Sequence, residues 1–389
     1  MISINEKYLA IAQNSPGVIN IIDSNDLNNL SKNNMISTND KSNILDMEFS
    51  PFDSNILAYS TENKSVIISK IDEKDKKITL SSFDTFQRHQ KKVNMVSFNP
   101  VASNIMSSGT LYGEVYIWDS TNLKEIYREL PKTSQNLTSL LWAPDGKSIG
   151  ISTKKGVLNI FDIRENKYYI QNQIEGFSDS TTDKIYFNWI DSNNIVALGH
   201  NKKKERIMCL FDIRKQVQNR KIKGYSSIKI DNAKADCIPF VNHELKLIYA
   251  VGKDTSKINI CDYSSSNLEK LTHQINVQES NVYSVMYPRK FLDKKKHEID
   301  RIVRSNKDSN NIYYVTIKIP EKNSGFDGDL YPKNESGRPL YTEKIWKEII
   351  EGKIKDKIIN NDKEDNDDKV KVKDEEKKEQ KFLNMIIKQ

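Results

Sequence analysis

The chain has 389 residues, of which 37% are hydrophobic and 29% are charged, and its formal net charge is +7. This composition can build a core beneath a very polar surface, so we expect a soluble protein. No stretch approaches the roughly 18 consecutive apolar residues of a membrane helix, and the first residues lack a secretion signal, so we expect no membrane span and a cytoplasmic location. The modest positive excess favours an acidic partner, such as a filament surface or a nucleic acid, without choosing between them.

The chain reads as short β-strands with an internal period. Its start, "EKYLAIAQNSPGVINIID", can supply a second and a third strand but has little room for a first. Apolar strands closed by a proline turn then end at Pro51, Pro100 and Pro144, at spacings of 49 and 44 residues. Two further strands follow each of them, which is the pattern of stacked supersecondary units.

The third strands of these units end in an apolar residue followed by Asp. This ending occurs at Trp118-Asp119, Phe161-Asp162, Phe211-Asp212 and, more weakly, Cys261-Asp262. Small sheets repeated at this period bury both faces when they are arranged around an axis. We therefore predict an all-β fold, a seven-bladed β-propeller over residues 1–320 with an incomplete first blade. The complete units are expected at residues 44–71, 93–130, 137–170, 184–222, 235–263 and 282–320.

The repeat length and the Trp118-Asp119 ending resemble those of WD40 repeats. The resemblance is strongest in "RHQKKVNMVSFNPVASNIMSSGTLYGEVYIWD", where His89 takes the His position of that family. The family's Asp lies six positions before the Trp, and Tyr112 stands there in this chain. We therefore expect an incomplete hydrogen-bond chain in this blade. The resemblance implies a structural role in the blades for His89, Trp118, Asp119, Asp162 and Asp212.

A different signature follows the last predicted strand. The segment "FDGDLYP...GRPLYTEKIWKEIIEG" contains, in order, an acidic-Leu-Tyr-Pro element, a Gly-Pro loop and a helix that bears a Trp. It resembles the extension that follows the propeller in coronins, and the similarity runs over about residues 6–352. The resemblance implies an extension at residues 321–352 that packs on the propeller through Leu330, Tyr331, Pro332 and Trp346.

The sequence also predicts how this extension continues. Thr342 suits a helix N-cap, and an apolar stripe of Ile345, Trp346, Ile349 and Ile350 should cover the bottom face or the last blades. We expect residues 353–389, dense in both signs of charge, to be a disordered tail. Its single apolar heptad is too short for a stable coiled coil, the module with which coronins oligomerise and bring in a regulator of actin-branching complexes. That partner is therefore in doubt.

Motifs for chemistry are scarce. The five histidines show no metal-ligand spacing, and neither a phosphate-binding Gly-rich loop nor a GxSxG elbow occurs. The three cysteines, Cys209, Cys237 and Cys261, form no CxxC pair, which predicts reduced thiols that pack as small hydrophobic side chains. We therefore expect no enzyme, no metal and no cofactor.

By its resemblance to coronins, the protein is expected to bind actin filaments in the cytoplasm and cytoskeleton, to regulate their organisation and turnover, and to have no nucleic-acid partner. The acidic exterior of a filament would pair with basic loops of the propeller. Each exposed pair is worth less than about 1 kcal/mol, so such a site needs several. The candidates are Arg88, Lys91, Lys92, Lys202, Lys203 and Lys204.

A second interpretation is a general WD40 scaffold or adaptor, such as a ubiquitin-ligase substrate receptor or a trafficking component. It rests on the ending "FDIR", which occurs at Phe161–Arg164 and again at Phe211–Arg214. In most propellers an Arg at this position only hydrogen-bonds around the end of its own blade, so the adaptor is the second choice.

Overall fold

The computed structural model describes residues 1–24, 34–74, 77–121, 126–133, 136–178, 183–215, 221–264, 268, 271–281, 283–289, 292–293, 296–306, 312–318 and 338–353. Leu330, Tyr331 and Pro332 lie outside these ranges, as do residues 354–389, so the expectations for them remain predictions. Within the described ranges, no helix has the length and apolar character needed to cross a membrane.

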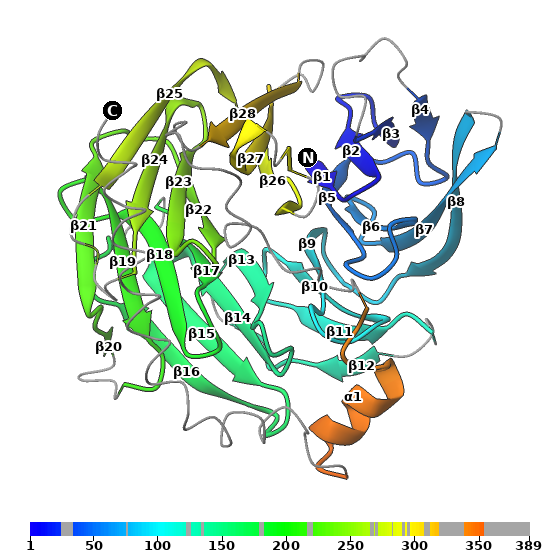
Figure 1. Cartoon of the computed structure of the whole chain (residues 1–389). Coiled ribbons are helices and arrows are strands. Elements are labelled where there is room, and N and C mark those ends of the chain that lie inside the picture. The colour runs from blue at the N-terminus through cyan, green and yellow to red at the C-terminus, as the bar shows by residue number, and fades with distance from the viewer. Residues whose placement is uncertain are drawn as a thin grey trace, which may run out of the picture.

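Seven small sheets, antiparallel except where β20 joins blade 4, surround a central axis and form a seven-bladed β-propeller (Figure 1). The third strand of each blade is strongly apolar because neighbouring blades cover both of its faces; β11, for example, is buried at every position. Blade 1 contains β1 Ile2–Ile4, β2 Tyr8–Ala12, β3 Val18–Asp23 and β4 Asn34–Ser37. Blade 2 contains β5 Ile44–Phe49, β6 Ile56–Thr61, β7 Val66–Lys74 and β8 Lys77–Phe86. Blade 3 contains β9 Val93–Phe98, β10 Ile105–Thr110, β11 Val115–Asp119 and β12 Ile126–Glu129.

The remaining blades follow the same order from the axis outward. Blade 4 contains β13 Leu137–Trp142, β14 Ser148–Thr153, β15 Val157–Asp162, β16 Lys167–Ile174 and the added β20 Lys221–Ile222. Blade 5 contains β17 Tyr186–Trp189, β18 Asn194–His200, β19 Arg206–Asp212 and β21 Ser226–Asp231. Blade 6 contains β22 Cys237–Asn242, β23 Leu247–Gly252, β24 Thr255–Asp262 and β25 Leu271–Asn281. Blade 7 contains β26 Tyr283–Met286, β27 Glu298–Ser305 and β28 Ile312–Lys318.

The first blade is complete, contrary to the prediction. The inner strand β1 pairs with β2, with Ile2 opposite Ile11, so blade 1 has four strands. A strand of three residues is too short to give a periodic signal, which is why the sequence does not reveal it. Blade 7 instead shows three strands among the described residues. Apolar packing between blades 1 and 7, including Ile11 and Val303, closes the ring.

The ends of the predicted units are less accurate than their starts. Residues 184–222 were expected to form one unit, but Lys221 pairs in parallel with Gln173 at the edge of blade 4. The outer strand of blade 5 is β21 instead. Outer strands are half exposed and polar, so their sequence resembles that of the loops beside them.

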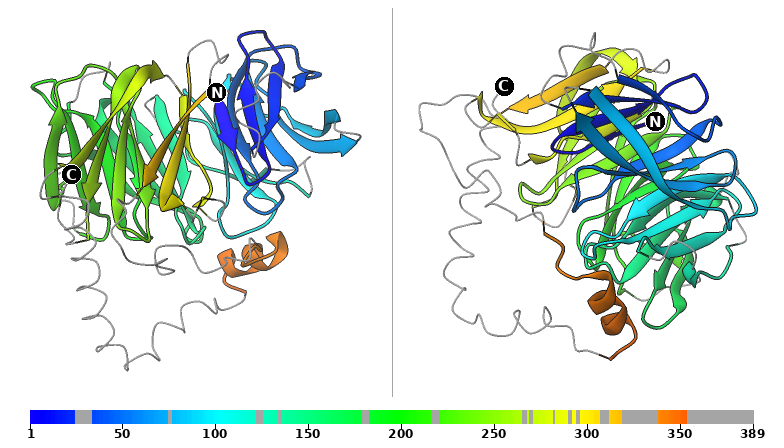
Figure 2. Two further views of the ribbon diagram at one scale, coloured as in Figure 1. Left: turned by 45° about the horizontal axis from the view of Figure 1, so that its top comes forward. Right: turned by 90° about the vertical axis from the view of Figure 1, so that its right-hand side faces the viewer.

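The ring has two faces that the strand directions define. We call the end at which the inner strands begin the top face and the opposite end the bottom face. The helix α1, Glu343–Ile350, lies against the bottom face (Figure 2). It packs on blades 3 and 4, not on the last blades.

A buried tryptophan holds α1 in place. Trp346 is 1% exposed, and its Nε1 donates to the carbonyl of Gly146 at 2.9 Å. Its ring centroid lies 6.0 Å from that of Trp142. Ile349 and Ile350 are buried beside it, whereas Ile345, which the sequence assigns to the same stripe, is 42% exposed. Positions 346, 349 and 350 share one helix face, and position 345 is rotated away from it.

Candidate functional site

The predicted basic residues fall on one face of the propeller. Arg88, Lys91 and Lys92 lie in the loop between β8 and β9, and Lys202 to Lys204 lie in the turn between β18 and β19. Loops that enter an inner strand and turns that join second and third strands both lie at the top face. All six side chains are exposed there.

His89 holds the loop of blade 3 from below its surface. The ring is buried, and its Nε2 lies 2.6 Å from Oγ of Ser108. The same Oγ accepts the Nε1–H of Trp118 at 2.6 Å. The hydroxyl hydrogen of Ser108 can therefore bond to Nε2, which assigns the ring proton of His89 to Nδ1.

An acid lies next to His89, although not at the position that the WD40 pattern expects. Oε2 of Glu114 is 3.6 Å from Nδ1 of His89, which is beyond hydrogen-bond distance, so the bonded chain ends at His89. The same carboxylate accepts the backbone N–H of Gln90 at 3.1 Å. Burial lowers the pKa of His89 to about 4, against the opposing effect of Glu114. The ring is thus neutral at physiological pH and suited to a structural role.

Two apolar side chains are exposed beside the blade 3 loop. Tyr112 is 54% and Leu111 is 38% exposed in the β10–β11 turn, and Nζ of Lys91 lies 5.8 Å from the ring centroid of Tyr112. The turn depends on Gly113, which has φ 93°, and a Cβ there would lie 2.4 Å from the carbonyl oxygen of Thr133. The WD40 pattern marks position 112 only as a replaced blade residue, so it does not reveal this exposed pair. The signal for it in the sequence is the apolar pair Leu111-Tyr112 inside a tight turn.

The lysine turn of blade 5 is fixed by its two end residues. The N–H of Lys204 donates to the carbonyl of Asn201 at 2.9 Å, and Nδ2 of Asn201 donates to Oε2 of Glu205 at 2.8 Å. Lys204 takes the left-handed conformation, with φ 61°. The backbone of the turn is therefore fixed by hydrogen bonds, while its three lysine side chains are exposed.

The six basic side chains differ in how far their charge is compensated. Lys92 pairs with Glu62 at 2.6 Å, and Lys204 pairs with Asp183 at 2.8 Å. For Lys91, Lys202 and Lys203, no ion pair occurs within the described part of the chain. These three carry the least compensated charge of the two clusters.

The Asp residues at the third-strand ends fix local structure on the bottom face. Asp119 pairs with Lys347 of α1 and accepts the N–H of Thr121 at 2.8 Å, so it ties the helix to blade 3. Asp162 and Asp212 each hold the Arg two residues later, with Nη2–Oδ2 distances of 2.7 Å for Arg164 and 3.0 Å for Arg214. Both FDIR arginines thus turn back onto their own blade ends.

The three cysteine thiols lie in the core of the propeller. Cys209, Cys237 and Cys261 are buried and free, and burial raises the pKa of each to about 12. Among the residues that the structure describes, no group of three His, Cys, Asp or Glu side chains is arranged to hold a metal ion.

Sequence comparison gives one consistent group of relatives, although no family model matches the chain. The coronin-like protein of Schizosaccharomyces pombe is 22% identical over 354 residues, which are 89% of this chain and 57% of that protein. Coronin-2A of Bos taurus is 22% identical over 318 residues, 79% of this chain and 58% of that protein. The chain thus spans little more than half the length of these relatives.

Structural comparison agrees with the sequence. The WD40 domain of Toxoplasma gondii coronin superposes with a TM-score of 0.78 at 24% identity, covering 89% of this chain and 87% of that domain. A chain of the mitotic checkpoint complex gives a lower TM-score of 0.61 at 16% identity. The chain is thus similar to coronins along nearly the whole propeller, and the solved coronin domain shows the same propeller fold.

Proposed function

We propose that this protein binds the side of actin filaments through the top face of its propeller. It acts in the cytoplasm and cytoskeleton as a binding protein without catalytic activity, and it influences filament organisation and turnover. The observation that carries the proposal is that basic clusters from two separate repeats share one face, together with an exposed aromatic side chain. The names of the relatives supply the partner, and the charge of this face suits an acidic one.

The contribution of each basic residue should follow its local pairing. Lys91, Lys202 and Lys203 can pair with acidic groups of a filament without first breaking an internal ion pair. Lys92 and Lys204 would have to exchange their own acidic partners, so we expect a smaller effect from them. Tyr112 adds an amphipathic ring of the kind that often carries binding energy at the centre of an interface.

A filament co-sedimentation assay at low and high salt tests the proposal. Replacement of Lys91, Lys202 and Lys203 by Glu should raise the dissociation constant at least about tenfold, because each change removes an attraction and adds a repulsion. Binding of the unchanged protein should weaken as salt rises. The melting temperature of the triple variant should stay within a few degrees of that of the unchanged protein.

A matched variant on the bottom face separates specific binding from total charge. Lys215, Lys246 and Lys344 are exposed there, and their replacement by Glu changes the net charge by the same amount. This control should pellet with filaments like the unchanged protein. Equal losses in both variants would mean that only net charge matters, and no pelleting of the unchanged protein would favour a general scaffold.

A further inference from the structure

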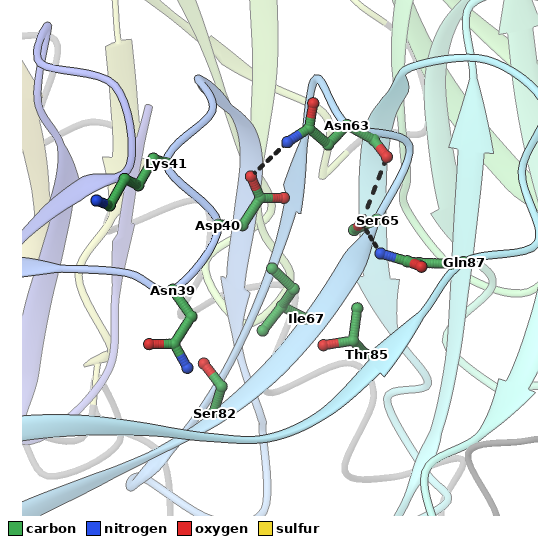
Figure 3. A pocket seen from close by; sticks show the side chains of 9 residues that line it. All are labelled: Asn39, Asp40, Lys41, Asn63, Ser65, Ile67, Ser82, Thr85 and Gln87. Atoms are coloured by element: carbon green, nitrogen blue, oxygen red, sulfur yellow. Dashed lines mark hydrogen bonds between the residues drawn. The ribbon is translucent and has the colours of Figure 1, made fainter.

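A polar hollow opens where the loop from blade 1 meets the top of blade 2 (Figure 3). It lies beside the basic loop of blade 3, because its lining residue Gln87 precedes Arg88 and its lining residue Asn63 follows Glu62, the partner of Lys92. Its volume is about 480 Å³. The residues around it come from the loop before β5, the β6–β7 turn, the start of β7, the outer strand β8 and the residue after it, and all but one are polar. They are Asn39, Asp40, Lys41, Asn63, Ser65, Ile67, Ser82, Thr85 and Gln87.

A close backbone contact seats the loop that carries Asp40. The N–H of Thr38 donates to the carbonyl of Gly17 at 2.7 Å, and Oγ1 of Thr38 donates to the carbonyl of Asp40 at 2.6 Å. A Cβ at Gly17, which has φ 68°, would lie 2.7 Å from that same carbonyl oxygen. The loop is therefore held in one position by blade 1, and the hollow is pre-formed.

Asp40 places an ionised carboxylate in this hollow. Its Oδ1 accepts Nδ2 of Asn63 at 2.8 Å and the N–H of Ser42 at 3.0 Å, and its Oδ2 accepts Oγ1 of Thr61 at 2.7 Å. Burial opposes ionisation, but these hydrogen bonds outweigh it and hold the pKa of Asp40 below its usual value. Oδ2 has accepted only one bond and keeps room for another donor.

This carboxylate is not neutralised by a neighbouring cation. Glu62, Asp183 and Asp236 of the top face all pair with lysines. Asp40 makes no ion pair within the described ranges, and the side chain of Lys41 extends away from it (Figure 3).

The surroundings of Asp40 favour a hydrogen-bonding cation over an anion. The hydroxyls of Ser82 and Thr85 line the hollow beside the apolar side chain of Ile67. An anion would be repelled by Asp40, whereas a long basic side chain could direct its charge to the carboxylate.

We propose that this hollow binds a lysine or arginine side chain presented by a partner protein. The ammonium or guanidinium group donates to Oδ2 of Asp40, and its remaining N–H groups bond to the hydroxyls of Ser82 and Thr85. The site and the lysine clusters prefer partner groups of opposite charge, because the site binds a basic group and the clusters bind acidic ones. It stands independently of the identity of the partner.

Titration of the full-length protein with N-acetyl-arginine amide and N-acetyl-lysine amide tests this site. The side-chain amide NMR signals of Asn39, Asn63 and Gln87 should shift and saturate at about millimolar concentration, the range expected for one charge-assisted contact. N-acetyl-norleucine amide has a similar stem without the charge and should produce no saturable shift. Equal shifts with norleucine would overturn the proposal.

Two variants link the binding to Asp40. Asp40→Asn keeps an oxygen acceptor for the surrounding donors but removes the charge, so binding should weaken at least tenfold. Thr85→Arg lies on the exposed outer strand and should fill the hollow with a guanidinium group of the chain itself, which blocks the probe without altering the Asp40 loop. Unchanged binding in either folded variant would show that the cation does not enter this hollow.

Discussion

Blades 3 and 5 hold the loops of the top face by different chemistry. Blade 3 uses a neutral chain in which Trp118 and His89 share the hydroxyl of Ser108. Blade 5 uses Arg206, which is 1% exposed. Its guanidinium bonds to both carboxylate oxygens of Asp231, with Nε 2.6 Å from Oδ1. Its Nη1 donates to the carbonyl of Ala235 at 3.3 Å, in the loop that enters the next inner strand.

The difference teaches how a repeat can be varied without loss of its fold. A neutral chain costs little to bury, because each group exchanges water for one hydrogen bond. A buried ion pair costs much more to desolvate and is stable only while both partners are present. Single substitutions in the ion pair of blade 5 should therefore lower the stability of the protein more than those in the neutral chain of blade 3. Mild acid should change the contribution of blade 5 to stability less than that of blade 3.

The largest expected effect comes from Arg206→Met. This change leaves the carboxylate of Asp231 partly buried without its cation and removes the contact to the loop at Ala235. The free energy of unfolding should fall by about 3–5 kcal/mol. Urea denaturation followed by circular dichroism measures it. A second substitution, Asp231→Leu, should recover part of the loss because it removes the unpaired charge.

The matched control is Arg214→Met in the same blade. Arg214 also pairs with an Asp of its own blade, at Asp212, but its side chain is 63% exposed. An exposed pair contributes less than about 1 kcal/mol, so this variant should unfold close to the unchanged protein. Similar losses from the two arginines would mean that burial does not distinguish the pairs.

A smaller loss is expected when the neutral chain of blade 3 is broken by Ser108→Ala. The Nε1–H of Trp118 and Nε2 of His89 lose their shared partner in a buried environment. The free energy of unfolding should fall by about 1–3 kcal/mol. Ser81→Ala on the exposed outer strand of blade 2 removes a hydroxyl of the same kind and should change it by less than about 0.5 kcal/mol. No difference between the two serines would remove Ser108 from the stabilising chain.

These two blades also show what sequence can predict. Third strands are evident because both of their faces are covered, which makes them rich in buried apolar residues, and the Trp118-Asp119 ending marks the repeat. The His89 position follows from the same pattern. Arg206 does not, because an arginine at the start of a strand looks like a surface residue, and Asp231 lies 25 residues further along the chain.

The candidate site was predictable only in part for the same reason. Lysine runs in loops are visible in the sequence, and the repeat places Lys91 and Lys202 in connections of the same face. The pairing of Lys92 with Glu62 joins two different blades, so only the packed ring reveals which charges are compensated. Exposure of Tyr112 likewise depends on a turn that brings Glu114, rather than residue 112, next to His89.

The smallest predicted effect separates the two blades by pH. The pKa of His89 is about 4 in the folded protein and about 6.5 in the unfolded chain, so between these values the unfolded chain binds a proton that the folded one does not. The stability that neutral His89 contributes is complete above pH 6.5 and declines as the pH falls toward 4. The difference in unfolding free energy between the unchanged protein and His89→Gln should shrink by about 1.4 kcal/mol from pH 7.5 to 5.5.

The ion pair of blade 5 should not respond over the same interval. Burial opposes ionisation of Asp231, but its hydrogen bonds with Arg206 and Ala233 outweigh burial and hold the pKa of Asp231 below the value of about 3.9 for an unfolded chain. The contribution of Asp231 is therefore present throughout pH 5.5 to 7.5 and is lost only in stronger acid. The loss caused by Arg206→Met should be the same at both pH values, while that caused by His89→Gln changes. A parallel response of the two variants would mean that a residue other than His89 controls the acid sensitivity of blade 3.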